Sequence, residues 1–522
     1  MSERMFKLEI GSHFFKIYCP VTSTWSENSW DKLQHTVLQF IRRYTYFRYE
    51  KGKDNKPMLK DTTVYASKTN DRKEYRFHIQ LLKEFIEFME EVYITPDRYE
   101  VTYREIYKAD KINFKLIDDI SLRDYQEDAR QFVLMPIGNN RSRLMEIQTG
   151  KGKGILSLAC IETIKERTAI VIGAQYIEKW VKEITEVSTL SDNDIYIVKG
   201  SKSLKYLIDL AKEDLLNYKI IVFSIQTLRN YYKEYEENPY ELELVGYGCN
   251  PDYLFETLKI GTMIIDEVHQ NIHAVYRMMT YTHIPLIIGL SATFLSDNAV
   301  IKRVQMAMFP LEVRYDKMAL DVYTRIYAIN YSFNNFNKNI IRTSEYGSNN
   351  YSHNAFEKSI LKNWRLKEGY LKLILHLFRR IYLEDSDSRD KIMIFASSIN
   401  MCYEIKKHIQ KHYKEFDVRT YVEGQPLEDA LEPNVIITTY QSGGTAIDIP
   451  NLRFVLQTVS ISSTTANIQI LGRLRKLPDR ETKFYYIYCR QLSKQYFYHQ
   501  RRMEIYRSRA LSIKELESTV SV

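Results

Sequence analysis

The sequence is poor in cysteine and has no long apolar run. Its five cysteines are scattered over 522 residues without a C-x-x-C pair, which argues against a zinc site and a disulfide framework and favours a reducing compartment. No segment approaches the ~18 apolar residues of a membrane-spanning helix. The first ten residues, MSERMFKLEI, lack the basic and apolar regions of a secretion signal. The sequence therefore predicts a soluble, intracellular protein with no membrane partner.

The excess of one charge is also small. Lys and Arg number 74 and Asp and Glu number 66, so the net charge is +8 and the pI is near 8.8. This excess permits a polyanionic partner but does not require one. The hydrophobic fraction of 44% is sufficient for extensive cores. At roughly 150 residues per domain, the length predicts about three domains.

Short β-rich apolar runs alternate with helical stretches from about residue 119 to 315, and again from about 320 to 490. The first set is TAIVIGA, KIIVFSI, GTMIIDE and LIIGLSA, and the second is RIYAINYSF, KIMIFAS, NVIITTY, RFVLQTV and KFYYIYC. Such runs are typical of buried parallel strands joined by crossover helices. About 115 residues with their own strands (FKLEI, FFKIYCP) and helices precede them. We therefore expect an α/β protein with two tandem parallel-sheet domains and an N-terminal α+β accessory domain. The expected boundaries are 1–115, 116–318, 319–490 and, for a basic C-terminal helix and tail, 491–522.

Residues 148–154, QTGKGKG, resemble a phosphate-binding loop. RLMEI before them is typical of a strand and ILSLACIETIKE after them of a helix, which is the context that such a loop requires. Glycine stands where Ser or Thr usually follows the phosphate lysine. We favour Lys153 over Lys151 as that lysine, because the other register leaves one residue too many before the helix. A glycine-rich turn that serves geometry alone is the alternative. The residues expected to bind the phosphates of a nucleotide are Thr149, Gly150, Lys151, Gly152, Lys153 and Gly154.

Asp266 and Glu267 follow an apolar strand in the run MIIDEVHQ. Carboxylates are costly to bury unless a metal or hydrogen bonds compensate them. Their chemistry suggests that Asp266 holds Mg²⁺, and that Glu267 orients and deprotonates an attacking water. A helix cap is the alternative interpretation of such a pair.

Taken together, the ordered motifs resemble those of superfamily 2 helicases and translocases. LRDYQEDA (122–129) is similar to the Q motif, QTGKGKG to motif I, DEVH (266–269) to motif II and SAT (291–293) to motif III. TTYQSGGTAIDIPNL (438–452) is similar to motif V and QILGRLRK (469–476) to motif VI. The resemblance implies two RecA-like lobes that clamp ATP and Mg²⁺. Within the superfamily, the pattern is most like the phage and viral branch-migration helicases of the UvsW type.

The resemblance also implies roles for single residues of the ATP site. Gln126 would read the adenine, and Asp448 would lie at the nucleotide. Gln469 and Arg473 would face the γ-phosphate, with an arginine finger after them. Because the family spacing G-R-x-x-R is contracted here, either Arg475 or Lys476 takes that place, and we favour Arg475. The residues that would couple nucleotide state to the nucleic-acid face are His269, Ser291 and Thr293.

Candidate nucleic-acid contacts are fewer. The resemblance places Gln175, Gln226 and Thr227 in motifs Ia and Ib, and Thr439 in motif V, where loops after strands contact a phosphate backbone. Ordinary strand-to-helix turns are an equally good explanation. The segment 490–509 carries a basic stripe that could follow a backbone electrostatically, or could be the solvated face of a helix that packs on the second lobe.

The function that these motifs predict is an ATP-dependent DNA helicase or translocase that remodels or unwinds duplex or branched DNA. An RNA or transcription-release helicase is one alternative. A degenerate ATPase that acts as a nucleic-acid-binding scaffold is another, suggested by Gly154 and the contracted motif VI. Replication, recombination or transcription proteins are possible partners.

Overall fold

The computed structural model describes residues 5–19, 27–51, 57–71, 73–148, 150–239, 246–316, 322–337, 340–345, 350–426, 428–443 and 448–522. The chain divides into two compact units. The first consists of Met1–Arg48, Lys60–Ile147 and Lys151–Met318, and the second of Tyr49–Leu59, Gln148–Gly150 and Ala319–Val522. Within the described ranges, every helix is too short or too polar to cross a bilayer.

The N-terminal part is a mixed sheet with helices, as predicted. Strands β1 and β7 are parallel, and the other neighbours are antiparallel. The strand order is β5 (Ser67–Lys68), β6 (Glu74–His78), β2 (Phe14–Tyr18), β1 (Phe6–Ile10) and β7 (Tyr99–Tyr103). Helices α1 (Glu27–Arg42) and α2 (Leu82–Glu91) bury aromatic residues such as Phe40 and Phe85 in its core. A separate two-stranded sheet consists of β3 (Thr45–Lys51) and β4 (Pro57–Val64).

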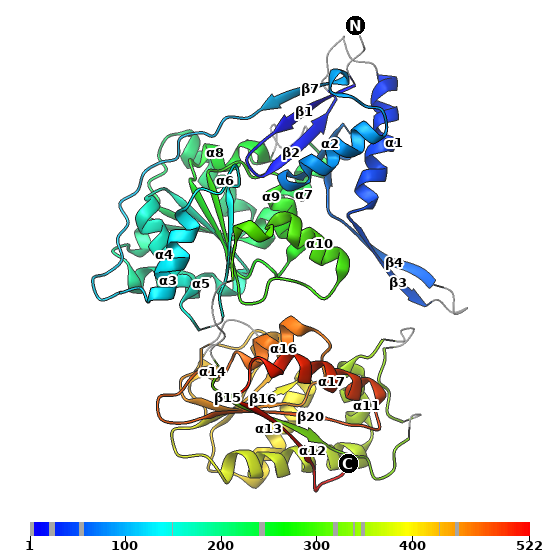
Figure 1. Ribbon diagram of the computed structural model, residues 1–522. Helices are drawn as coiled ribbons and strands as arrows, with labels where there is room; N and C mark the ends of the chain where they lie inside the picture. Colours follow the sequence, from blue (N-terminus) through cyan, green and yellow to red (C-terminus); the bar gives the residue numbers. More distant parts are fainter. Residues whose placement is uncertain are drawn as a thin grey trace. The chain divides into compact units, whose positions relative to one another are not determined.

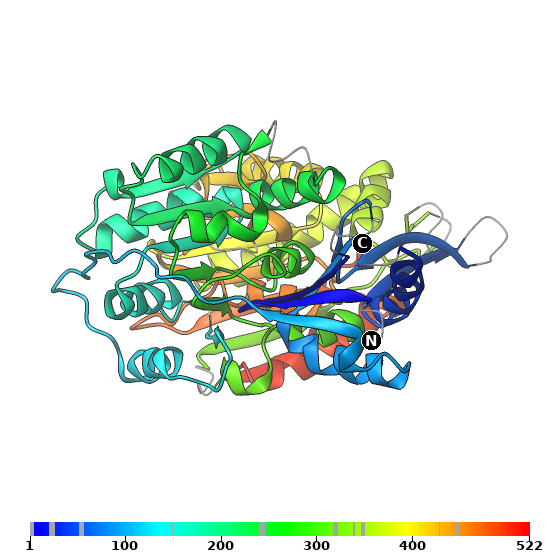
Figure 2. The ribbon, with the colours of Figure 1, turned by 90° about the horizontal axis from the view of Figure 1, so that it is seen from above.

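This sheet shares a core with the α/β domain that follows it in the same unit, and Figures 1 and 2 show the blue strands against the green helices. A buried ion cluster joins the two parts. Asp252 accepts hydrogen bonds from Arg76 Nη2 at 2.7 Å and from Lys16 Nζ at 2.8 Å. The guanidinium of Arg76 is fully buried. The N-terminal part is thus fixed to its neighbour by charge as well as by apolar packing.

The first α/β domain is built on a sheet of seven parallel strands. The strand order is β10 (Ile195–Val198), β11 (Ile220–Ser224), β9 (Thr168–Ile172), β12 (Thr262–Ile265), β13 (Leu286–Ser291), β8 (Ser142–Glu146) and β14 (Arg314–Tyr315). Alternate strand residues face opposite layers, because side chains alternate along a strand. Ile170 and Ile172 face one layer, consisting of α3 (Asp124–Leu134), α4 (Lys153–Ile164) and α5 (Ile177–Val187). Ala169 and Val171 face the other, consisting of α6 (Ser201–Lys212), α7 (Ile225–Glu237), α8 (Leu254–Thr257), α9 (Ile272–Met279) and α10 (Ala299–Met308).

The second unit also contains seven parallel strands covered by helices. The strand order is β17 (Val418–Tyr421), β18 (Val435–Thr439), β16 (Lys391–Ala396), β19 (Leu452–Gln457), β20 (Thr482–Tyr488), β15 (Thr324–Asn330) and β21 (Ser512–Glu517). One face packs against α11 (His353–Lys362), α12 (Trp364–Phe378) and α13 (Ile399–His412). The other packs against α14 (Glu428–Leu431), α15 (Tyr440–Gly443), α16 (Thr464–Leu471) and α17 (Ser493–Arg507). The predicted fold class, two tandem parallel RecA-like domains after a mixed N-terminal sheet, is confirmed.

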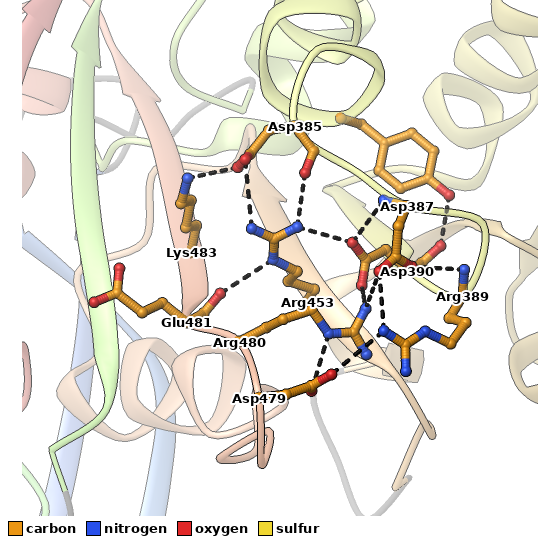
Figure 3. Close-up of polar contacts among 10 residues, drawn as sticks. Asp385, Asp387, Arg389, Asp390, Arg453, Asp479, Arg480, Glu481 and Lys483 are labelled. Carbon is orange, nitrogen blue, oxygen red and sulfur yellow. Dashed lines mark hydrogen bonds and ion pairs between the residues drawn. The ribbon is translucent and has the colours of Figure 1, made fainter.

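An ion network closes the amino ends of the strands in the second unit (Figure 3). Arg453 of β19 donates to Asp390 at 2.9 Å and pairs with Asp385 at 3.4 Å. Lys483 of β20 pairs with the same Asp385, and Arg480 pairs with Asp390. The segments that carry motifs V and VI follow the carboxyl ends of β18 and β19, at the opposite edge of the sheet.

Candidate active site

The glycine-rich loop has the backbone that a phosphate-binding loop requires. Gly150 and Gly152 have φ angles of 82° and 72°, in the left-handed region that glycine adopts without strain. Helix α4 starts at Lys153, and no side chain caps its first turn. Its leading N–H groups and its dipole therefore favour an anion at this end. Thr149 lies outside the described residues.

Lys153 and motif II meet at the carboxyl edge of the sheet. The Nζ of Lys153 lies 3.2 Å from Glu267 Oε1, and both side chains are largely buried. Asp266 directly follows β12, and its Oδ2 accepts a hydrogen bond of 2.9 Å from the indole N–H of Trp180 in α5. Its Oδ1 accepts the backbone N–H of Glu267 at 2.8 Å. The sequence separates these groups widely, and the fold brings them together.

The charges of Asp266, Glu267 and Lys153 suit a site that binds a metal cation next to an anion. Burial, and secondarily the charge of Glu267, raises the pKa of the Asp266 carboxyl, while Lys153 opposes this shift. Two carboxylates and one ammonium group leave an excess of negative charge in a buried place, which Mg²⁺ would relieve. Next to both carboxylates is a cavity of about 20 Å³, which is room for one water.

His269 links motif II to motif III. Its Nδ1 lies 2.9 Å from Ser291 Oγ and 3.3 Å from Glu267 Oε2. Burial lowers the pKa of His269, which favours a neutral ring at pH 7. Ser291 Oγ also accepts the backbone N–H of Thr293 at 3.2 Å. Glu267 is therefore connected to the loop that carries Thr293 through His269 and Ser291.

Gln126 supports the loop from the side. Its Oε1 accepts the N–H of Arg123 at 3.0 Å, and its Nε2 donates to the carbonyls of Lys151 and Gly152 at 3.3 Å. The hydroxyl of Tyr125 also donates to the Lys151 carbonyl, at 3.0 Å. These contacts hold the loop. Reading of an adenine by Gln126 stays a prediction.

A carboxylate occupies the space beside Gly154. A Cβ atom built on Gly154 would overlap the carboxyl group of Glu183, with its Cδ only 2.7 Å away. Glu183 lies one helical turn after Trp180 in α5. Helix α5 thus contributes two side chains to the site, Trp180 at Asp266 and Glu183 at Gly154, and the sequence did not predict either of them. The only available signal was their i, i+3 spacing in the helix after motif Ia.

The candidate nucleic-acid residues of the first domain have mixed surroundings. Gln175 is exposed, in a single 3₁₀ turn before α5. Gln226 accepts a hydrogen bond of 2.8 Å from Ser224 Oγ. The Thr227 hydroxyl is buried and accepts the backbone N–H of Gly200 at 2.8 Å. Thr227 therefore holds the loop before α6, and only Gln175 is openly accessible.

The motif residues of the second unit lie at the carboxyl edge of their own sheet. Thr439 ends β18, and its Oγ1 donates to Ser442 Oγ at 3.0 Å. In motif VI, Arg473 is buried, and its Nε donates to the carbonyl of Gln469 at 3.3 Å. Arg475 pairs with Asp448 at 3.4 Å and donates to the carbonyl of Gly472, whereas Lys476 is exposed. The pairing of Arg475 with motif V brings Asp448 and the favoured finger residue together.

Comparison with known proteins bears mainly on the first α/β domain. Residues 119–296 match the family described as "Type III restriction enzyme, res subunit". This range includes the Q motif and motifs I, II and III, and the match supports the resemblance to superfamily 2 helicases. No curated protein matches the chain. Among solved structures, the helicase domain of Pyrococcus furiosus Hef is similar at 14% identity, with a TM-score of 0.43, over 73% of this chain and 98% of that one.

Proposed function

We propose that the protein is an ATP-dependent helicase or translocase that acts on DNA. The observation that carries this proposal is the meeting of Lys153, Asp266 and Glu267 at the carboxyl ends of β8 and β12. In parallel α/β sheets, this edge is where ligands bind. The family match over residues 119–296 supports the same assignment.

In this proposal each residue of the site has a separate task. Lys153 and the N-terminus of α4 bind the β- and γ-phosphates, and Asp266 holds Mg²⁺, which neutralises phosphate charge when bound. Glu267 orients the attacking water and accepts its proton. Lys153 pairs with Glu267 in the described structure. A bound phosphate would replace Glu267 as the partner of Lys153, and Glu267 could then act as a base.

The second unit contributes the remaining groups. Gln469, Arg473 and Arg475 stabilise charge on the γ-phosphate, with Arg475 as the finger. ATP binding draws the two lobes together and hydrolysis releases them, so that the enzyme advances along a strand. The boundaries 1–115, 116–318, 319–490 and 491–522 remain our proposed division of the chain.

Duplex, forked or branched DNA is the substrate that we propose, in line with the resemblance to branch-migration helicases. The basic segment 490–509, which contains α17, offers fewer basic side chains to a phosphate backbone than its sequence indicates. Arg502 is buried, where its Nη2 donates to the carbonyl of Val459 at 2.8 Å, and Arg490 pairs with Glu517 at 3.1 Å. Exposed basic residues such as Lys494 and Arg507 remain for a phosphate backbone.

ATP turnover measured with no nucleic acid, single-stranded DNA, forked DNA, duplex DNA and RNA tests this proposal. We expect the largest stimulation with forked or duplex DNA. Stimulation by RNA alone would favour the RNA-helicase alternative. Nucleic-acid binding without any ATP turnover, at every Mg²⁺ concentration, would favour the scaffold alternative.

A further inference from the structure

Motif I lacks the hydroxyl that usually follows its lysine, and the structure puts another oxygen group in that neighbourhood. The residue after Lys153 is Gly154, which has no side chain. The carboxyl group of Glu183 occupies the space in which a Thr or Ser side chain at position 154 would begin. A side chain at position 154 would have to displace the Glu183 carboxyl group, so position 154 and Glu183 share one space beside the loop.

The Glu183 carboxylate has no hydrogen bond or ion pair with any residue that the structure describes. Burial raises the pKa of its carboxyl group, and the nearby charge of Asp266 raises it further, while Lys179 opposes the shift. Glu183 is half-buried, and a carboxylate that is partly removed from water without a bonded partner carries a cost. A cation beside Asp266 would relieve both carboxylates at once.

A second contact places helix α5 next to Asp266, the residue that we expect to hold Mg²⁺. Trp180, one turn before Glu183, donates its indole N–H to Asp266 Oδ2 at 2.9 Å. Since residues i and i+3 lie on the same face of a helix, Glu183 is presented on the face that already contacts Asp266.

We propose that Glu183 replaces the missing hydroxyl of motif I and contacts Mg²⁺ through one of the metal's water ligands. This inference rests on the proposed function. The part of the chain that the structure describes contains no group of three acidic, His or Cys side chains close enough to hold a metal directly. A water-mediated contact needs no such group, because Mg²⁺ keeps several waters and takes only one or two carboxylates.

The test is equilibrium binding of a fluorescent, non-hydrolysable ATP analogue to the full chain over a range of Mg²⁺ concentrations. Glu183→Ala should raise the Mg²⁺ concentration for half-maximal binding by about 10- to 100-fold, the usual cost of losing a group that orients a metal site. Nucleotide binding without Mg²⁺ should not weaken, because a negative charge has been removed from near the phosphates. Glu186→Ala, an exposed position on the same helix, is the matched control.

A compensating pair of substitutions separates a metal role from a structural one. In Glu183→Ala/Gly154→Thr, the new hydroxyl takes over the metal contact in the space that the carboxylate has left, so the Mg²⁺ midpoint should return toward that of the wild type. Glu183→Gln keeps the shape without the charge and should behave like Glu183→Ala. Thermal unfolding of each variant checks its folding.

The experiment distinguishes failure of the Glu183 inference from failure of the proposed function. If Lys153→Ala abolishes nucleotide binding but Glu183→Ala and Glu183→Gln keep the wild-type Mg²⁺ midpoint, the ATP site stands and the role of Glu183 is overturned. If the wild type binds no nucleotide at any Mg²⁺ concentration, the proposed function fails and this inference fails with it.

Discussion

Replacing Asp252 with Asn would leave two buried cations without their counter-charge. Arg76 is fully buried, Lys16 is 9% exposed and Asp252 is 4% exposed. Although burial alone would raise it, the charges of Arg76 and Lys16 hold the pKa of Asp252 well below its usual range. Breaking a buried pair by removing one partner costs about 3–5 kcal/mol. Asn keeps one acceptor oxygen, so we expect about 3 kcal/mol from Asp252→Asn.

The loss should appear where the N-terminal sheet meets the first α/β domain. Because a chain of two units does not unfold in one step, hydrogen exchange at the amides of β2 and β6 is a better assay than a global melting curve. The matched control is Asp214→Asn. Asp214 is highly exposed and pairs with Lys259 at 3.1 Å, a surface pair worth about 1 kcal/mol or less. Its positive φ is one that Asn tolerates.

The buried cluster also makes the stability of the N-terminal sheet depend on pH. Since the folded-state pKa of Asp252 is depressed, the unfolded state binds more protons, and the contribution of this pair is lost as pH falls below about 4. The variant should lack this acid loss. If the amides of β2 and β6 are as well protected from exchange in Asp252→Asn as in Asp214→Asn, the cluster does not stabilise the N-terminal sheet.

Two further substitutions test the hydrogen bond of Trp180 and the raised pKa of Glu357. Trp180→Phe removes the N–H donated to Asp266 and keeps a buried ring. The Mg²⁺ concentration required for nucleotide binding should therefore rise by about 10- to 100-fold. An unchanged requirement, as expected for the exposed Trp364→Phe, would remove Trp180 from the site. Burial raises the pKa of Glu357 to about 7, so the wild type should lose stability as pH rises through the window from about 4.5 to 7, by roughly 2 kcal/mol between pH 5 and 7. Glu357→Gln should remove this pH dependence of the free energy of unfolding, measured by urea unfolding. The same pH dependence in the variant and the wild type would contradict the prediction.

Much of the fold could be predicted because buried parallel strands are marked by continuous β-branched runs. TAIVIGA contains β9 and KIMIFAS contains β16, and both lie inside all-parallel sheets. Strand β21 could not be predicted in the same way. Its sequence, SIKELE, is mostly exposed, since it pairs only along one edge, with β15. The second sheet therefore extends past residue 490.

Side chains that act at a distance in sequence were harder to predict. Trp180 reaches Asp266 and Glu183 reaches Gly154 because α5 packs against α4, and no local pattern marks such packing. Arg502 belongs to a stripe that resembles a solvated face, but it is buried against the carbonyl of Val459 and the ring of Tyr486. The roles assigned to the motif residues stay predictions, although Lys153, Asp266 and Glu267 do meet.

The most direct test of the central claim compares ATP binding and ATP turnover in Glu267→Gln and the wild type, with forked DNA present. The amide keeps the shape of the carboxylate and loses the base. We predict that the variant binds ATP and DNA as the wild type does, and that its hydrolysis is slower by about 10²–10⁴-fold, the contribution of a general base. Glu186→Gln should turn over normally. Turnover by Glu267→Gln close to that of the wild type would contradict the account.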